Sequence, residues 1–594
     1  MTVSIQNEND IEVGESIPPM TAHAVSVSLP TWKANVGYEE GEDWVVKSMK
    51  TGYPRFFIHK SIEAFANAIV SKHGQSGERA MLFPTHVIAE RCRNFITSRV
   101  SGAEQLVRIV DLVPISEKAR SEELTIISPR VSAVLFPQEH FPVAKQFWQH
   151  SGDGVSSRRA EYCHGLFVEG VLVESSTINI SSRPCKGPRR YQNKASIDLG
   201  KPVDKSNSHT EPQDPTQFVE ERFGRNLDIS KTRNAKLAVR RRIAGSLTAD
   251  VGLTEAISAQ PDVNHDEKHG GRSEDDVYLY PCGMSSIFNA HRNLMATKGP
   301  LKSIVYGFPY IDTLKIVEKF SPGALFYGFG SSKELDDLET RLEGGQRFLA
   351  LFCEFPGNPQ LRSPDLERIH ALADKYDFYV VVDETIGNFL NVNVLPYADI
   401  VVSSLTKIFS GDSNVMGGSL VLNPKGKYYK ELKHTWSQDY EDHHWAEDSI
   451  FLERNSRDFV SRIERINTNA EAICNVLRAH PRVKNVYYPK YSETRTHYDN
   501  CRTPKGGYGG LLSVTFHSQA DSITFFDQLD SSKGPSLGTN FTLSSPYVIL
   551  AHYGELDWCA SWGVEADLVR VSVGLEEPSK LVSTFQRALD ALSR

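Results

Sequence analysis

Short, almost wholly apolar runs recur through the second half of the chain, and polar side chains follow them directly. Residues 379–382 lead into Asp383, and residues 400–402 lead into Ser403. Apolar runs of this length, rich in β-branched residues, are typical of strands buried in a parallel sheet. Apolar residues also recur at helical spacing between 581 and 592, which predicts a closing amphipathic helix. The pattern predicts an α/β fold built on a mostly parallel sheet.

The composition changes along the chain and suggests several regions, because 594 residues are too many for one hydrophobic core. We expect a disordered N-terminus over residues 1–19, an N-terminal extension domain of unknown role over 20–185, and a polar linker over 186–216. A large α/β domain over 217–465 and a smaller α+β domain over 466–594 complete the prediction.

Overall composition and charge narrow the class of protein. The formal net charge is −8, which does not favour binding to nucleic acid or to a membrane surface. Eight scattered cysteines without a C-x-x-C pair argue against a metal site or a disulfide framework. The N-terminus is acidic, and no apolar run approaches the ~18 residues that a spanning helix needs. We therefore expect a cytoplasmic protein.

Polar residues at two predicted strand ends suggest the chemistry. In parallel sheets, ligands bind beyond the carboxyl ends of the strands, where Asp383, Ser404, Thr406 and Lys407 are expected. A lysine there can form a Schiff base with an aldehyde, and an acid can keep a pyridine nitrogen protonated. Pyridoxal 5′-phosphate (PLP) requires that pairing. A lysine after a strand is more often a solvated surface residue, so the interpretation depends on further parts of a site.

Three other segments provide such parts. Gly283 and Met284 open a predicted helix after a short strand, where free backbone N–H groups bind anions. Tyr306 ends another apolar run and could stack on a pyridine ring. Alternation around residue 570 points Arg570 to one face of a strand, where a buried guanidinium suits a substrate carboxylate. An ordinary turn, a packed tyrosine and a structural Arg–Glu pair are the alternatives.

Taken together, the segments resemble the Cys/Met-metabolism PLP enzymes, which include cystathionine γ-synthases, cystathionine lyases and O-acylhomoserine sulfhydrylases. The matching segments follow the family's order: YPCGMSSI, the YG pair at Tyr306, EFPGNPQL, VVDETIGN, SSLTKIFSGDSNVMGGSLV, PSLGTNFTL and RVSVGLEE. They cover residues ~275–594 and are highly specific. The long N-terminal extension resembles the fungal-type synthase branch.

The resemblance implies the fold type I of PLP-dependent transferases and a role for each matching residue. It makes Lys407 the lysine that binds PLP and Asp383 the partner of the pyridine nitrogen. Other matching residues are assigned to the ring stack (Tyr306), the phosphate cup (Gly283, Met284, Ser404, Thr406), the substrate carboxylate (Asn358, Arg570) and the loop beside the lysine (Ser536).

The implied reaction is γ-replacement of the acyl group of an O-acylhomoserine by L-cysteine, which gives L-cystathionine. Freed Lys407 would be the general base. A cystathionine β- or γ-lyase and an O-acylhomoserine sulfhydrylase are alternatives within the family, and a non-catalytic PLP-fold regulatory protein is an alternative outside it. The acyl group itself stays open.

One family feature is altered. A Tyr-x-Arg pair from a neighbouring subunit usually completes the phosphate site in this family, which implies a homodimer as the minimum and favours a tetramer. Here Arg222 matches the arginine, but Glu220 stands at the tyrosine position. A second hypothesis is that Tyr53 and Arg55 supply the pair. Cys282 also replaces the usual serine before Gly283.

Overall fold

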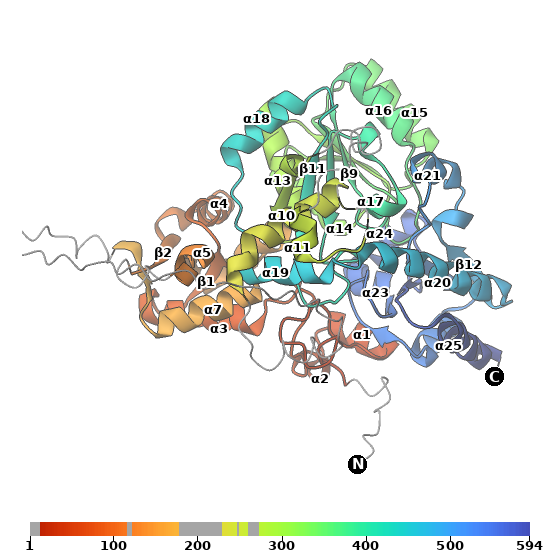
Figure 1. Cartoon of the computed structure of the whole chain (residues 1–594), viewed down its shortest axis with the longest axis horizontal. Coiled ribbons are helices and arrows are strands. Elements are labelled where there is room, and N and C mark those ends of the chain that lie inside the picture. Colours follow the sequence, from red (N-terminus) through yellow and green to blue (C-terminus); the bar gives the residue numbers. More distant parts are fainter. Residues whose placement is uncertain are drawn as a thin grey trace, which may run out of the picture.

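The computed structural model describes residues 12–115, 122–176 and 228–593, apart from 246, 248 and 259–272. In these ranges the chain forms an N-terminal, a central and a C-terminal sheet, which Figure 1 shows side by side. The predicted linker at 186–216 and the residues Glu220 and Arg222 lie outside the described residues. No described helix is both long and apolar enough to cross a bilayer.

The central sheet has seven strands, and all are parallel except β11, which is antiparallel to both of its neighbours. The mostly parallel sheet that the sequence predicts is therefore confirmed. In spatial order the strands are β5 (Val277–Tyr280), β11 (Gly418–Leu422), β10 (Ile400–Ser404), β9 (Tyr379–Asp383), β8 (Ala350–Glu354), β6 (Ser303–Tyr306) and β7 (Ala324–Tyr327).

Helices cover both faces of the central sheet, because alternate side chains of its apolar strands point to opposite sides. In β9, Val381 packs in the core of one face and Val380 in the core of the other. The first face is covered by α13 (Gly283–Lys298), α14 (Ile311–Phe320) and α18 (Tyr429–Asp439). The second face is covered by α10 (Thr232–Ala244), α15 (Ser332–Glu343), α16 (Leu366–Tyr376) and α19 (Ala446–Asn455). The short helices α11 (Leu253–Ser258) and α17 (Asn388–Asn391) lie between these elements in the chain.

A long helix, α20 (Phe459–Ala479), leads into the smaller C-terminal part of the chain. Its five strands lie in the order β12 (Val483–Tyr487), β13 (Leu511–Phe516), β16 (Val569–Ser572), β15 (Leu543–Pro546) and β14 (Ser532–Lys533). The helices are α21 (Arg495–Cys501), α22 (Gln519–Gln528), α23 (Tyr547–His552), α24 (Leu556–Ser561) and α25 (Pro578–Asp590). The predicted closing amphipathic helix is α25, whose apolar face is buried.

The N-terminal sheet is antiparallel and shares its core with the central sheet. Its strands lie in the order β1 (Glu78–Phe83), β3 (Val131–Pro137), β2 (Arg108–Pro114) and β4 (Leu172–Glu174). The helices are α3 (Lys60–His73), α4 (His86–Thr97), α5 (Glu122–Ile127), α6 (Phe141–Ser151) and α7 (Ser157–Val168). Helices α3 and α7 pack with one another on one face. Helices α4 and α6 join the core of α13 and α14 on the other.

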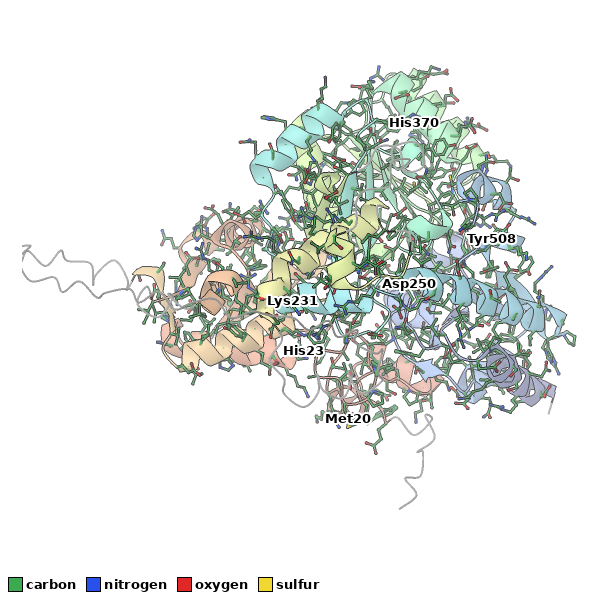
Figure 2. All side chains as sticks on the ribbon, in the orientation of Figure 1. Met20, His23, Lys231, Asp250, His370 and Tyr508 are labelled. Carbon is green, nitrogen blue, oxygen red and sulfur yellow. The ribbon has the colours of Figure 1, made fainter. Side chains whose placement is uncertain are left out.

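The first described segment, residues 12–29, lies along the C-terminal domain. Ser16 and Val27 form a bridge, and the backbone N–H of Leu29 donates to the carbonyl of Lys533 at 2.9 Å. Residues 12–19 therefore differ from the disordered terminus that their composition predicts, because backbone pairing holds them. Helices α1 (Trp32–Glu39) and α2 (Asp43–Val46) follow, and Met20 and His23 mark the segment at the lower edge of Figure 2.

Candidate active site

A pocket opens at the carboxyl ends of the central strands, and all three parts of the chain line it. Glu354, Asp383 and Ser404 end the adjacent strands β8, β9 and β10. The C-terminal domain adds Ser536 and Arg570. The N-terminal region adds a stretch from Gly52 to Phe57 and residues around Gly152. The end of the sheet that the sequence predicts to bind a ligand thus borders the cavity.

Lys407 lines this pocket from the turn after β10. Its Nζ donates to Tyr53 Oη at 3.0 Å and to Ser536 Oγ at 2.9 Å. Only 7% of the lysine is exposed, which excludes the solvated surface residue that was the alternative reading. Ser536 has a left-handed φ of 98°, a conformation that costs energy for a residue with a Cβ. The structure therefore brings the predicted Lys407 and Ser536 together, with strain at the serine.

Two carboxyl groups lie side by side where β8 and β9 end. Glu354 and Asp383 are direct neighbours in the strand register, and Asp383 Oδ1 accepts a hydrogen bond from the backbone N–H of Thr385 at 2.8 Å. Burial raises the pKa of Asp383. Burial and the charge of Asp383 raise the pKa of Glu354 to about 8. Glu354 therefore holds a proton at neutral pH more readily than an ordinary glutamate does.

Glu354 also joins two loops of the pocket, a role that the sequence interpretation missed. Its carboxyl group accepts hydrogen bonds from the backbone N–H groups of Tyr310 and Asn358, the latter at 3.0 Å. The available signal was its place directly after an apolar strand, beside Asp383. Through these bonds Glu354 fixes the loop before α14 relative to the loop that carries Asn358.

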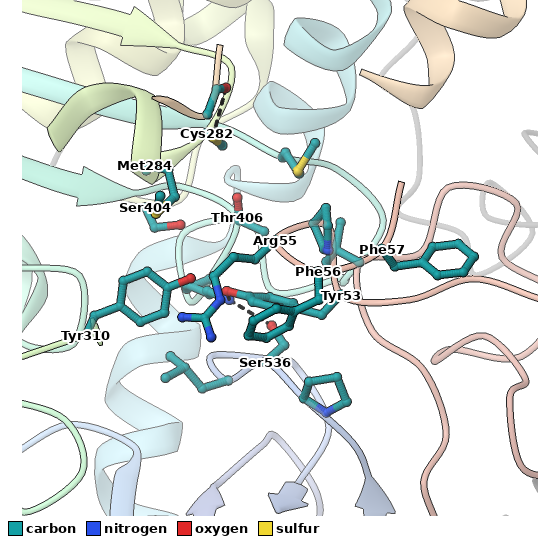
Figure 3. A pocket seen from close by; sticks show the side chains of 18 of the residues that line it. Tyr53, Arg55, Phe56, Phe57, Cys282, Met284, Tyr310, Ser404, Thr406 and Ser536 are labelled. Atoms are coloured by element: carbon teal, nitrogen blue, oxygen red, sulfur yellow. Dashed lines mark hydrogen bonds between the residues drawn. The ribbon is translucent and has the colours of Figure 1, made fainter. Parts of the chain in front are cut away.

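The residues predicted to form a phosphate cup lie together where α13 begins. A Cβ added to Gly283 would lie 2.6 Å from the Ser404 Cβ, so only glycine permits this close approach of the helix to the end of β10. Met284 and Ser404 both face the pocket, as Figure 3 shows. The Thr406 hydroxyl lies nearby and accepts from the Gly417 N–H at 3.1 Å. The free N–H groups at the start of a helix with adjacent hydroxyls form a site for a phosphate.

Arg570 forms the other wall of the pocket. Its guanidinium donates to Asn358 Oδ1 at 3.3 Å and to the Ser536 carbonyl at 2.5 Å, and it lies 4.5 Å above the Tyr547 ring. These partners are all neutral. Among the described residues, Arg570 therefore does not form the structural ion pair with a glutamate that was the alternative. Burial lowers the pKa of Arg570. A buried guanidinium of this kind is stabilised by an anionic ligand such as a carboxylate.

Tyr306 does not reach this pocket, so its predicted stacking role is wrong. The side chain is 2% exposed, and its hydroxyl donates to the Ser331 carbonyl at 3.0 Å beside a separate small hollow. Gly307, with a φ of +87°, turns the chain after β6. Tyr310, three residues after Gly307, lines the pocket instead.

The hypothesis that Tyr53 and Arg55 reach the cofactor site agrees with the geometry. Tyr53 comes from the same chain as Lys407 and contacts it directly. Arg55 is 6% exposed, and its Nη1 lies 2.8 Å from Asp312 Oδ2. Figure 3 shows Tyr53, Arg55 and Tyr310 gathered around the middle of the pocket.

The N-terminal region also supports the start of α13. The Cys282 thiol donates to the Gly152 carbonyl at 3.3 Å, so the cysteine at the family's serine position has a defined contact. Asp153 accepts hydrogen bonds from Ser285 and from the Asn289 side chain, the latter at 3.1 Å. Asp153 was not predicted, because nothing in its local sequence indicates that partners over 130 positions away surround it.

The residues fit PLP. The space beside Gly283, which a single Cβ would fill, can accept a phosphate. The buried amine of Lys407 can form a Schiff base with the aldehyde, and the Asp383 carboxylate can pair with the ring nitrogen. The Arg570 guanidinium in the pocket wall can bind the carboxylate of an amino acid. The fold and the site therefore define a PLP-dependent enzyme that acts on amino acids.

Comparisons with known proteins agree with this class. The family model "Cys/Met metabolism PLP-dependent enzyme" matches residues 272–590, and the model "Fungal trans-sulfuration enzyme, N-terminal domain" matches residues 61–156. This chain belongs to the Cys/Met-metabolism PLP-dependent enzymes.

Relatives match over almost the whole chain. A cystathionine γ-synthase of Neurospora crassa is 55% identical over 97% of this chain and 98% of its own. A cystathionine γ-synthase of Saccharomyces cerevisiae is 42% identical over 97% and 98%. An alanine racemase of Aspergillus violaceofuscus is 31% identical over 97% and 96%. Among solved structures, a cystathionine γ-synthase of Xanthomonas oryzae is 20% identical with a TM-score of 0.47, over 61% of this chain and 98% of its own.

Proposed function

We propose that this chain is a cystathionine γ-synthase, which replaces the acyl group of an O-acylhomoserine with L-cysteine. The observation that carries the proposal is Lys407, buried between Tyr53 and Ser536, with Arg570 on the opposite wall. The 55% identity to a synthase over nearly the whole chain supports the particular reaction.

Each residue has a role in this proposal. PLP, when bound, withdraws electrons from the substrate Cα. Arg570 and Asn358 hold the α-carboxylate, so the bonds to be broken stay aligned. The Lys407 amine removes the proton from Cα, and a second proton is lost from Cβ as the acyl group leaves Cγ as its carboxylate. The cysteine thiolate then adds at Cγ, and protons return to Cβ and to Cα, the latter from the Lys407 ammonium. Asp383 keeps a positive ring nitrogen in place by its negative charge.

The test is a product assay with purified protein, PLP and cysteine, run with O-acetyl- and O-succinylhomoserine in parallel. Cystathionine that forms only when cysteine is present supports the proposal and identifies the acyl donor. Pyruvate or 2-oxobutanoate from added cystathionine would instead indicate a lyase. Racemisation of alanine without cystathionine would indicate the activity of the Aspergillus relative. Lys407→Ala should abolish the product and the absorbance of the lysine-bound cofactor.

We further infer a homo-oligomer, a dimer or a tetramer, as the resemblance of the motifs implies. Sedimentation of the full chain measures this, and a monomer at working concentration would refute it. The cytoplasmic location also stays a prediction from the sequence.

A further inference from the structure

The turn that joins α6 to α7 lies directly against the first turn of α13. Gly152 in this turn has a left-handed φ of 65°, a conformation that favours glycine. A Cβ added to it would lie 2.7 Å from the Cys282 Sγ, the Met284 Cβ and the Ser285 backbone nitrogen. Only glycine therefore permits the N-terminal region to approach the start of the helix this closely.

The first turn of α13 is limited on its other side as well. A Cβ added to Gly283 would lie 2.6 Å from the Ser404 Cβ at the end of β10. The start of the helix thus fits between Gly152 of the N-terminal region and Ser404 of the central sheet, and neither contact has space for a further carbon atom. Figure 3 shows Cys282, Met284 and Ser404 together at this point. The N-terminal region therefore sets one of the two limits on where the helix can begin.

The residue after Gly152 holds this arrangement with a buried carboxyl group. Asp153 is 0% exposed, and its Oδ1 accepts hydrogen bonds from the Ser285 hydroxyl and from Asn289 Nδ2, the latter at 3.1 Å. Both donors belong to the first two turns of α13. Burial raises the pKa of Asp153, although the hydrogen bond from Ser285 opposes this rise. Burying a carboxyl group costs free energy, so a functional role is a reasonable hypothesis.

A second series of contacts ties the same helix to the N-terminal region. Asn289 Oδ1 accepts from Arg292 Nη2 at 2.9 Å, and Arg292 Nη1 donates to Asp439 Oδ1 in α18 at 2.8 Å. Arg91 of α4 donates to the same Asp439 oxygen at 3.4 Å. The contacts from Asp153 to Arg91 are therefore continuous, and a shift of the helix start would break bonds along the first three turns of α13.

The place of this first turn decides how a phosphate can be bound. Backbone N–H groups at the start of a helix point at the anion, and hydrogen bonds weaken steeply when the distance or the angle changes. In the predicted phosphate cup, Gly283 and Met284 belong to the helix, whereas Ser404 and Thr406 belong to the end of β10 and the turn after it. A displaced helix start would therefore weaken its own bonds to the phosphate and leave the other two residues in place.

We propose that Asp153 is a positioning residue for the phosphate of PLP, and that the N-terminal region thereby sets the affinity of the cofactor site. Asp153 does not touch the phosphate; it acts through Ser285 and Asn289, which hold the first two turns of α13 at the cup. The inference goes beyond the proposed reaction, because it gives the N-terminal extension a role in binding the cofactor. A residue that acts in this way should affect the binding of PLP and not that of pyridoxal, which has the same aldehyde and no phosphate.

The experiment is a titration of the PLP-free full chain with PLP and, separately, with pyridoxal, followed by the absorbance of the lysine-bound aldehyde. Asp153→Ala removes the acceptor for both donors. It should lower the ratio of PLP affinity to pyridoxal affinity roughly tenfold or more, which corresponds to the loss of one charge-assisted hydrogen bond to the phosphate. Asp153→Asn keeps an acceptor oxygen at the position of Oδ1 and should leave the ratio nearly unchanged.

Glu453→Ala is the matched control, because it removes another buried carboxyl group, which pairs with Arg242 at 3.0 Å and is not among the described residues that line the pocket. The melting temperature of each PLP-free variant separates positioning from a general loss of stability. Both alanine variants should melt at a lower temperature, but only Asp153→Ala should lose the preference for PLP over pyridoxal. If Asp153→Ala does not fold, Asn289→Ala removes one of the two donors on the helix and should lower the same ratio.

Three results would overturn the proposal. They are an unchanged ratio in Asp153→Ala (or in Asn289→Ala, where the first variant does not fold), an equal fall of the ratio in Glu453→Ala, and equal losses in Asp153→Ala and Asp153→Asn. The titration contains no amino-acid substrate, so its result does not depend on which reaction the enzyme catalyses. A missing cystathionine product would refute the proposed function and leave the Asp153 assignment standing.

Discussion

Replacing Arg570 with lysine keeps the positive charge in the pocket and removes the planar fork. In the structure the guanidinium is oriented by Asn358 Oδ1 at 3.3 Å, by the Ser536 carbonyl at 2.5 Å and by the Tyr547 ring at 4.5 Å. A lysine ammonium cannot keep these contacts and also bind both oxygens of a carboxylate. The expected loss is one charge-assisted hydrogen bond, about 1.5–3 kcal/mol, or a roughly 10- to 150-fold rise in KM for the acylhomoserine.

The assay is steady-state formation of cystathionine with varied acylhomoserine, together with the PLP content of each protein. Arg242→Lys is the matched control, because Arg242 is equally buried but pairs with Glu453 at 3.0 Å outside the pocket. The control should lose stability and keep its KM. An Arg570→Lys enzyme with an unchanged KM would refute the reasoning, as would a rise in KM that the Arg242 control reproduces.

Three further predictions concern individual pocket residues. Tyr306→Phe should lower the free energy of unfolding by about 1 kcal/mol in a denaturant titration and leave kcat/KM unchanged. Tyr310→Leu should lower kcat/KM more than tenfold, because Tyr310 lines the pocket. Equal effects of the two variants on kcat/KM would contradict the placement of the two side chains. The raised pKa of Glu354 means that unfolding releases its proton between pH 4.5 and about 8, so stability falls as pH rises through that window. Glu354→Gln should remove about 5 kcal/mol of this pH dependence in the PLP-free protein, and an unchanged slope would contradict it. Gly283→Ala should weaken PLP binding at least tenfold in a fluorescence titration, because the new Cβ would lie 2.6 Å from Ser404; unaltered affinity would show that the helix can shift.

The sequence indicated best those residues whose position follows from a strand. Asp383 is the last residue of β9 and Lys407 lies three residues beyond the end of β10, and neighbouring parallel strands end at the same edge of a sheet. Arg570 lies on the face of β16 that alternation predicts. In these cases local periodicity fixes both the end and the face of the element, so the site follows without knowledge of the tertiary packing.

Residues in loops were harder to place, and the two tyrosines after β6 show the reason. Tyr306 is the last residue of the strand and Tyr310 lies in the loop, yet only the second reaches the pocket. The side to which the strand's last residue points depends on register, and a shift of one position reverses it. The positive φ of Gly307 then sets the direction of the loop. The pattern of apolar residues does not predict this backbone angle.

The N-terminal region shows a second limit, and it bears on how the enzyme functions. Tyr53 and Lys407 are 354 positions apart, and Asp153 and Ser285 are 132 apart, so no local signal connects them. The same region packs its α4 and α6 into the core of α13 and α14, directly behind the phosphate cup. Folding of the N-terminal region and formation of the pocket therefore depend on one another. A cofactor bound at Lys407 should stabilise the N-terminal sheet as well as the central one, since ligand binding stabilises every part of the fold that the binding site requires.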